Sequence, residues 1–190
     1  TKSLIILPTL KGAEYQAVKD LGFGRRLAVV SDVTTHEVLG QRVEGSLAPL
    51  YDVTSIVLPR NPYPDGETVE KIRVATAKCD AVIAVGSGTI NDVCKYGSAL
   101  DKKPYAVFAT APSMNGYTSV NAAITMHGHK MSLPAQAPMG AFFDLGVLAA
   151  APARMIRSGL GDSLCRTTAQ ADWLLSHFLF GHAYRQLPYE

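Results

Sequence analysis

Short apolar runs alternate with longer amphipathic segments along most of this chain. The apolar runs are rich in Val, Ile and Ala and end at Asp, Gly, Pro or Ser, a pattern typical of buried strands. We expect strands within residues 2–12, 25–32, 54–60, 80–87 and 103–112, and one more within 139–152 that ends near Asp144.

The amphipathic segments lie between these runs and predict helices. Apolar residues recur at helical spacing over residues 34–50 and again over 66–79, and a third helix is expected from about Gly88 to Ala99. Strands that alternate with helices of this length indicate βαβ units. The predicted fold class is therefore α/β, a Rossmann-like parallel sheet with helices on both faces.

The pattern changes after Pro152. No β-rich run follows, and the apolar positions keep helical spacing at Leu160, Leu164, Thr168, Ala171, Leu175 and Leu179. A helix this apolar needs other helices to cover it. We therefore expect two domains, with an α/β domain over 1–152 and the first part of a truncated all-helical domain over 153–190. The alternatives are that this segment packs back on the sheet or that a partner chain covers it.

Composition excludes several classes of function. The net charge is +2, so the chain shows no basic footprint for nucleic acid. No apolar run reaches the roughly 18 residues of a membrane span. The three cysteines are far apart in sequence and odd in number, which argues against a disulfide framework and favours a reducing cytoplasm.

Three polar segments fall where predicted strands end. They are Asp32, Gly86–Asp92 and Thr110–Ser113. In an open parallel sheet, ligands bind beyond the carboxyl ends of the strands. These segments therefore predict one crevice to which three parts of the chain contribute.

The segment "AVIAVGSGTINDVCKY" carries the clearest candidate chemistry. Glycine lets the backbone approach a ligand closely, and the start of the following helix offers unpaired N–H groups that favour an anion. The spacing matches neither GxGxxG nor the P-loop, so a tight turn without a ligand is the alternative. Asp32 has two interpretations, because it can accept the hydroxyls of an adenine ribose, which favours NAD, or cap the following helix.

The motifs "GSGTINDVCKY", "ATAPSMNGYTS" and "SGLGDSLCRTTAQADWLLSH" together resemble the sn-glycerol-1-phosphate dehydrogenases, within the wider group of iron-containing alcohol dehydrogenases, glycerol dehydrogenases and dehydroquinate synthases. The resemblance covers nearly the whole chain. It implies a dehydroquinate synthase-like enzyme in which NAD or NADP lies between an α/β domain and a helical domain, beside a divalent metal held by one aspartate and two histidines.

The resemblance also assigns roles to individual residues. The pyrophosphate would lie against Gly86, Ser87, Gly88, Thr89, Ile90, Asn91 and Asp92. The nicotinamide side would be lined by Thr110, Ala111, Pro112 and Ser113, with Ser119 as a further cofactor contact. Asp162 would be the catalytic aspartate, which binds both metal and substrate. Without the resemblance, Asp162 would be interpreted as a helix N-cap.

The chain departs from the family pattern at one position. The family commonly has aspartate where this chain has Asn115, and an amide can bind a substrate hydroxyl but supplies no charge. The identity of the polyol therefore stays open.

The remaining metal ligands are expected beyond residue 190. We do not expect them at His177 and His182, whose spacing of five puts them on different faces of a helix, and His127 and His129 are interpreted as part of a solvated β-hairpin. The cationic partners of a substrate phosphate are also expected outside this chain.

The leading hypothesis is an oxidoreductase, represented here by an incomplete fragment. It would interconvert sn-glycerol 1-phosphate and dihydroxyacetone phosphate in phospholipid synthesis. A glycerol or other polyol dehydrogenase, a dehydroquinate synthase and an NAD-binding module inactive by itself are the alternatives. The metal is expected to be zinc or nickel in preference to iron. A homo-oligomer, a dimer or larger, is expected.

Overall fold

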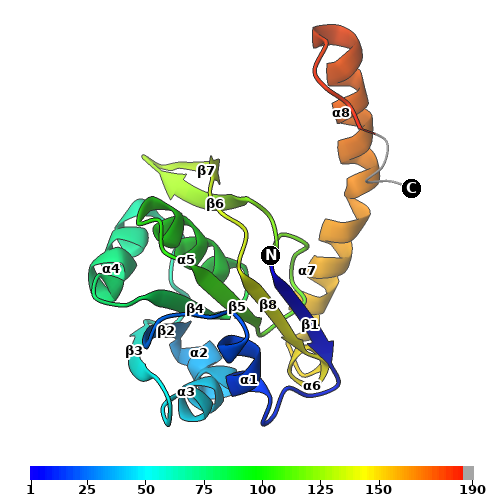
Figure 1. Ribbon diagram of the computed structural model, residues 1–190. Coiled ribbons are helices and arrows are strands. Elements are labelled where there is room, and N and C mark those ends of the chain that lie inside the picture. Colours follow the sequence, from blue (N-terminus) through cyan, green and yellow to red (C-terminus); the bar gives the residue numbers. More distant parts are fainter. Residues whose placement is uncertain (186–190) are drawn as a thin grey trace.

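The computed structural model describes residues 1–185 and contains a six-stranded parallel sheet (Figure 1). The strand order is β1-β8-β5-β4-β2-β3. The strands are β1 (Ser3–Leu7), β2 (Arg26–Asp32), β3 (Asp52–Leu58), β4 (Ala81–Gly86), β5 (Tyr105–Ala109) and β8 (Gly140–Asp144). Every neighbouring pair runs parallel, as the sequence predicts.

Burial explains which strands lie at the centre. Every residue of β4 and β5 is buried, whereas the edge strands β1 and β3 keep many exposed positions. Strands covered on both faces need continuous apolar runs, and "AVIAVG" is such a run. The chain reverses direction across the sheet beside β2, which pairs with β3 on one side and β4 on the other. A reversal of this kind opens a crevice at the carboxyl ends of β2 and β4.

Helices cover both faces of the sheet, so the predicted fold class is confirmed. Figure 1 shows α4 and α5 on one face and α1, α2 and α3 on the other. The helices of these layers are α1 (Glu14–Lys19), α2 (Val33–Thr35), η1 (His36–Gly40), α3 (Gln41–Leu47), α4 (Gly66–Thr76) and α5 (Gly88–Leu100). A short helix, α6 (Leu145–Ala149), follows β8.

The helix predicted over 34–50 forms as α2, η1 and α3 in succession. Leu39, Val43 and Leu47 are buried against the sheet, as their spacing predicts. Val38 and Leu50, which share that spacing, are exposed. Val38 is exposed because it lines a cavity, and Leu50 because α3 has already ended.

A β-hairpin formed by β6 (Asn121–Met126) and β7 (His129–Pro134) stands apart from the main sheet. Its turn contains His127 and Gly128, both with positive φ. The hairpin interpretation of this segment is confirmed. His127 lies in the turn itself, so it does not share a strand face with His129.

The chain after Pro152 forms two helices, α7 (Ala153–Leu164) and α8 (Arg166–Phe180), which we call the helical arm. Figure 1 shows the arm projecting away from the α/β body, which we define as residues 1–149. Among the described residues of α8 none is buried. The segment therefore does not pack back on the sheet, and its apolar side chains, such as Leu164 and Phe178, are exposed. No helix within residues 1–185 is long and apolar enough to cross a membrane.

Candidate active site

Two cavities meet at the amino-terminal end of α5. The first cavity, of ≈ 670 Å³, follows the carboxyl ends of the strands, where Thr9, Asp32, Ser87, Thr110 and Asp144 line it. The second cavity, of ≈ 610 Å³, lies between α5, the loop after β5, the hairpin and α7. Thr89 lines both cavities, so the start of α5 forms their common wall.

The turn between β4 and α5 depends on Gly86. A Cβ at this position would lie 2.5 Å from Cβ of Ile90, so only glycine lets α5 pack this closely on the end of β4. At Gly88 a Cβ would meet only Sδ of Met114, at an ordinary contact distance of 3.5 Å. The first glycine is therefore required by packing, whereas the second is not.

The first amides of α5 remain available to a ligand. Within residues 1–185, no side chain caps this helix at Ser87. The amide of Asn91 is the first to close a helical hydrogen bond, to the carbonyl of Ser87 at 2.9 Å. The N–H groups of Gly88, Thr89 and Ile90 thus point out of the helix start, where they favour an anion.

Asp32 performs the capping role that the sequence leaves open. Its Oδ1 accepts hydrogen bonds from the amides of Thr34 at 2.8 Å and Thr35 at 2.9 Å, in a capping box. This holds the carboxylate at the rim of the first cavity. Capping uses Oδ1 alone, so Oδ2 can still accept a hydroxyl, and the two interpretations of Asp32 are compatible.

The loop after β5 is divided between the two cavities. Thr110 and Ala111 line the first, while Asn115 and Ser119 line the second. Pro112 and Ser113 line neither, because α7 covers this part of the loop. A Cβ at Gly159 of α7 would lie 1.8 Å from the carbonyl oxygen of Pro112, so the two backbones are in direct contact.

Asp162 contacts the same loop from α7. Its Oδ2 accepts a hydrogen bond from the amide of Asn115 at 2.7 Å, and its backbone carbonyl accepts one from the Asn115 side chain at 3.1 Å. Asp162 lies inside α7, so the N-cap interpretation is wrong. An aspartate at 115 could not donate the second hydrogen bond, which gives Asn115 a structural role at this junction.

A buried lysine of α5, which the sequence analysis did not identify, anchors the loop after β5. Lys95 is fully buried in α5, and its Nζ donates to the carbonyl of Gly116 at 2.9 Å, to Oγ of Ser119 at 3.0 Å and to the carbonyl of Asn121 at 3.1 Å. Burial lowers its pKa, although the carboxylate of Asp92, 3.7 Å away, acts in the opposite direction. Lysine is rarely buried completely, so composition and spacing gave no signal for it.

Asp92 links α5 to the hairpin. Its Oδ2 accepts the amide of Ala123 at 3.1 Å, and its Oδ1 accepts the side-chain amide of Asn91 at 3.0 Å. Burial raises the pKa of Asp92, and these hydrogen bonds and Lys95 oppose the rise. Asp92 lines the second cavity, as a candidate site residue should.

Most of the residues predicted for the site line one of the two cavities, but not all of them are free to contact a ligand. Asn91 is fully buried and its amide is used within the helix, so it does not belong to the ligand-facing set. Ser119 faces the second cavity, but its Oγ accepts a hydrogen bond from Nζ of Lys95, and its single O–H is shared between the carbonyl oxygens of Gly116 and Asn121, both at 2.9 Å.

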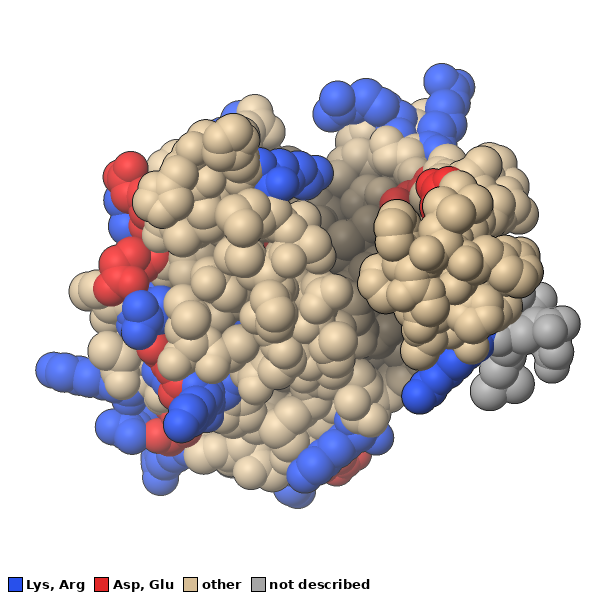
Figure 2. Space-filling view, turned by 90° about the horizontal axis from the view of Figure 1, so that it is seen from above, with Lys and Arg blue, Asp and Glu red and all other residues tan. Residues whose placement is uncertain are grey.

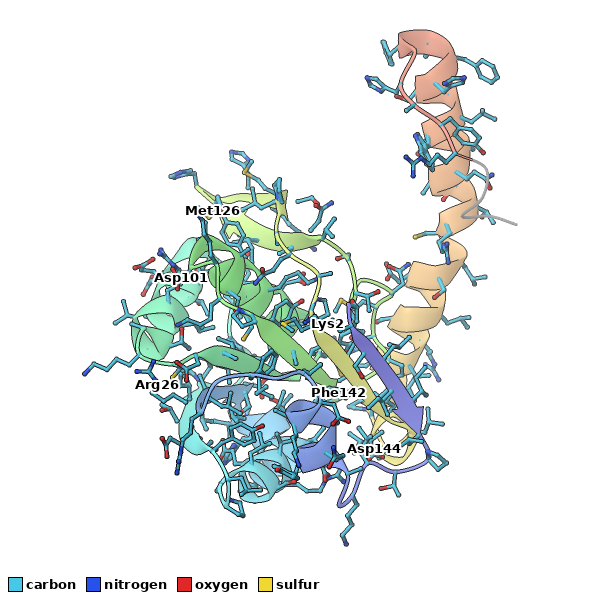
Figure 3. All side chains as sticks on the ribbon, in the orientation of Figure 1. Lys2, Arg26, Asp101, Met126, Phe142 and Asp144 are labelled. Carbon is cyan, nitrogen blue, oxygen red and sulfur yellow. The ribbon has the colours of Figure 1, made fainter. Side chains whose placement is uncertain are left out.

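The far end of the first cavity contains charged residues that the sequence did not indicate. Arg42 pairs with Glu14 and Asp144, both at 2.6 Å, and both carboxylates are almost completely buried. Asp144 is labelled in Figure 3 at the end of β8. Burial opposes ionisation of Asp144, yet hydrogen bonds from the amide of Leu10 and from Arg42 outweigh it and hold its pKa below the ordinary value.

The described residues do not by themselves form a metal centre. Within residues 1–185, no three His, Cys, Asp or Glu side chains gather closely enough to hold a metal ion. His177 and His182 lie at the end of the arm, where Nδ1 of His177 is 2.6 Å from the carbonyl oxygen of His182 and Nδ1 of His182 is 2.6 Å from Oγ of Ser176. Asp162 is thus one candidate ligand without companions in this part of the chain.

Comparison with known families gives a match over most of the α/β body. The sequence profile of the family described as iron-containing alcohol dehydrogenase matches residues 9–152.

Curated relatives extend the similarity. Glycerol-1-phosphate dehydrogenase [NAD(P)+] of Bacillus subtilis (strain 168) is 34% identical over 166 residues, which are 84% of this chain and 42% of that protein. The enzyme of the same name from Thermococcus kodakarensis is 30% identical over 190 residues, covering 97% of this chain and 53% of that protein. The chain thus spans about half the length of the curated relatives it matches.

Solved structures share the fold. A glycerol dehydrogenase from Schizosaccharomyces pombe superposes with a TM-score of 0.74 at 24% identity, over 86% of this chain and 42% of that chain. A 2-deoxy-scyllo-inosose synthase complexed with carbaglucose-6-phosphate, NAD+ and Co2+ gives a TM-score of 0.69 at 14% identity, over 83% and 46% of the two chains. At these identities the likeness concerns the fold alone.

Proposed function

Because the chain belongs to the iron-containing alcohol dehydrogenase family, we propose that it forms the cofactor-binding half of an NAD(P)-dependent sn-glycerol-1-phosphate dehydrogenase. In this proposal residues 1–152 are the nucleotide-binding domain and residues 153–190 begin a helical domain. The observation that carries the proposal is the junction of two cavities at the uncapped amides of α5.

The cofactor would extend along both cavities. Its pyrophosphate would lie on the amides of Gly88, Thr89 and Ile90, because these N–H groups have no helical partners. The adenosine would occupy the first cavity, where Oδ2 of Asp32 can accept a ribose hydroxyl. The nicotinamide would then reach the second cavity, which Asp162 lines.

The cofactor supplies hydride transfer at a secondary alcohol carbon, and this chain would orient it. Two hydrogen bonds hold Asn115, in the loop after β5, against Asp162 of α7. A substrate in the second cavity would then lie between the nicotinamide and α7. We expect the substrate to be sn-glycerol 1-phosphate or dihydroxyacetone phosphate, from the names of the curated relatives.

A divalent metal also belongs to the proposal, with Asp162 as the ligand from this chain. Its carboxylate already lies at the second cavity, where it could bind a metal and a substrate oxygen. The described residues hold no companion ligands, so the others would come from elsewhere in the complete polypeptide.

A polyol dehydrogenase is the competing function within the same fold. The observation that favours it is the neutral Asn115, whose side chain bonds to the backbone of α7. Initial rates with sn-glycerol 1-phosphate and with glycerol, measured on the complete polypeptide that contains this sequence, separate the two. A higher kcat/KM for plain glycerol would overturn the substrate assignment.

The cofactor site can be tested without turnover through Gly88→Ala. The added methyl fits the fold, since its nearest neighbour is Sδ of Met114 at 3.5 Å, but it stands where the cofactor crosses between the cavities. We expect the Kd for NADH to rise at least about tenfold, which corresponds to about 1.4 kcal/mol. Titration of NADH fluorescence measures it.

Gly45→Ala provides the matched control. Gly45 is also a helical glycine, and a Cβ there would meet nothing within 4 Å. We expect this variant to bind NADH as the wild-type protein does. Equal Kd values for Gly88→Ala and wild type, or no NADH binding by the wild type at millimolar concentration, would contradict the assignment of the two cavities.

A further inference from the structure

Three charged side chains line the second cavity, and they differ in their partners. Asp92 is bonded to Ala123 and Asn91 and lies beside Lys95, while Asp162 accepts the amide of Asn115. Lys130, the third, makes no hydrogen bond or ion pair with any residue in the described range 1–185. The cavity therefore holds two engaged carboxylates and one cation that is available to a ligand.

The hairpin fixes the side on which Lys130 stands. Side chains alternate along a strand, so Lys130 and Ser132 of β7 share one face, together with Thr125 and Ala123, the residues paired with them on β6. Both Lys130 and Ser132 line the second cavity. On the opposite face, Ile124 is buried in the core.

The hairpin is also held firmly to α5. Nζ of Lys95 bonds the carbonyl of Asn121 at 3.1 Å, and Oδ2 of Asp92 bonds the amide of Ala123 at 3.1 Å. These contacts fix the first strand of the hairpin to α5, so the position of Lys130 follows from the fold. Figure 2 shows the hollow between the body and the helical arm, with basic side chains at the rim on the body side and both acidic and basic side chains on the side of the arm.

We propose that Lys130, with the hydroxyl of Ser132, forms the subsite that binds the phosphate of a phosphomonoester substrate. This inference rests on the proposed function and adds the residue that selects a phosphorylated polyol over a plain one. Without Lys130 the charged lining of the cavity would be two carboxylates, which repel a phosphate dianion. The sequence led us to expect the cationic partners outside this chain, and the cavity lining indicates that one of them is within it.

The test uses Lys130→Met in the complete polypeptide that contains this sequence. Methionine keeps an apolar stem but removes the charge. We expect KM for sn-glycerol 1-phosphate to rise by about ten- to hundredfold, the size of a lost charge-assisted contact to phosphate. KM for glycerol and the Kd for NADH should stay at their wild-type values, because neither ligand carries a group that reaches Lys130.

Two further variants show whether the charge at position 130 causes the change in KM. Lys130→Arg restores a cation and should keep KM for the phosphorylated substrate near the wild-type value. Lys78→Met removes a lysine that lines neither cavity, so KM for both substrates and the Kd for NADH should stay at their wild-type values. Inorganic phosphate should compete with sn-glycerol 1-phosphate in all these proteins, and its inhibition constant should rise in Lys130→Met alone.

The outcomes separate the subsite from the proposed function. If the wild type prefers sn-glycerol 1-phosphate and Lys130→Met keeps that preference, the subsite is wrong and the function stands. If the wild type shows no preference for phosphorylated substrates, both are wrong. Equal losses with glycerol and with the phosphorylated substrate would mean that Lys130 only supports the hairpin, which also overturns the subsite.

Discussion

The α/β body and the helical arm are held together by different kinds of contact. In the body, two apolar clusters fill the space between the sheet and its helices, and the central strands are buried along their whole length. In the described part of the arm, Gly159 is the only buried residue of α7, and α8 has none. The body is stabilised by side-chain burial, whereas the arm depends on a few contacts with one loop.

This difference identifies the loop over residues 110–121 as the joint of the molecule. From the body, Lys95 donates three hydrogen bonds to its second half. From the arm, Gly159 and Asp162 contact its first half. The candidate active site lies at this joint, so the geometry of the site depends on both sets of contacts.

The largest expected effect follows from removing the anchor on the body side. Lys95→Met deletes a buried ammonium and leaves Asp92 without its cation, and breaking such a pair costs about 3–5 kcal/mol. We expect the free energy of unfolding, measured by urea titration, to fall by that amount. Hydrogen exchange of the amides in 116–121 should accelerate as well.

Lys103→Met is a useful comparison, because Lys103 also donates to a backbone carbonyl, that of Thr76, but is partly exposed. It should lose less stability and leave exchange in 116–121 unchanged. A Lys95→Met protein as stable as the wild type would show that the joint does not depend on this anchor.

A smaller effect is expected from the arm side. A methyl at Gly159 would lie 1.8 Å from the carbonyl oxygen of Pro112, and such overpacking costs about 1–3 kcal/mol or more. Gly159→Ala should therefore release α7 from the loop while the body stays folded. Limited proteolysis should cut within 150–165 faster than in the wild type.

Gly161→Ala, two residues further along α7, is the control, since a Cβ there meets nothing within 4 Å. It should be cut at the wild-type rate. Equal cutting of both variants would contradict the view that the backbone contact holds the arm.

The smallest effect concerns the side chain that joins the two regions directly. Asn115→Ala removes one hydrogen bond to the carbonyl of Asp162 and should weaken docking of α7 by about 0.5–1.5 kcal/mol. Asn115→Asp should weaken it more, because a carboxylate cannot donate and stands beside that of Asp162. The proteolysis rates of the two variants measure this order, and the reverse order would mean that the amide of Asn115 is not needed as a donor.

The sequence predicted the body better than the joint, for a physical reason. Burial on both faces of a parallel sheet requires apolar runs, and these are visible in "RRLAVVSD" and "AVIAVGS" without any coordinates. The contact of Gly159 with Pro112 joins residues that are 47 positions apart, and no local pattern records it.

The same contrast applies to the candidate site. Residues at strand ends, such as Asp32 and Gly86, could be found because the end of an apolar run is visible in sequence. Lys95 could not, because a lysine in a helix is ordinarily exposed. Lys130 had a usable signal, since Lys130 and Ser132 are polar at every second position of a strand, which indicates a polar face.

The pairing of β1 with β8 sets an order on the folding of the sheet. Ser3 pairs with Gly140 and Leu7 with Asp144, so these two strands come from parts of the chain that are 137 positions apart. No other neighbouring strands of the sheet are as far apart in sequence. Contacts between distant parts of a chain form slowly, so we expect the edge strand β1 to join the sheet after the strands at its centre.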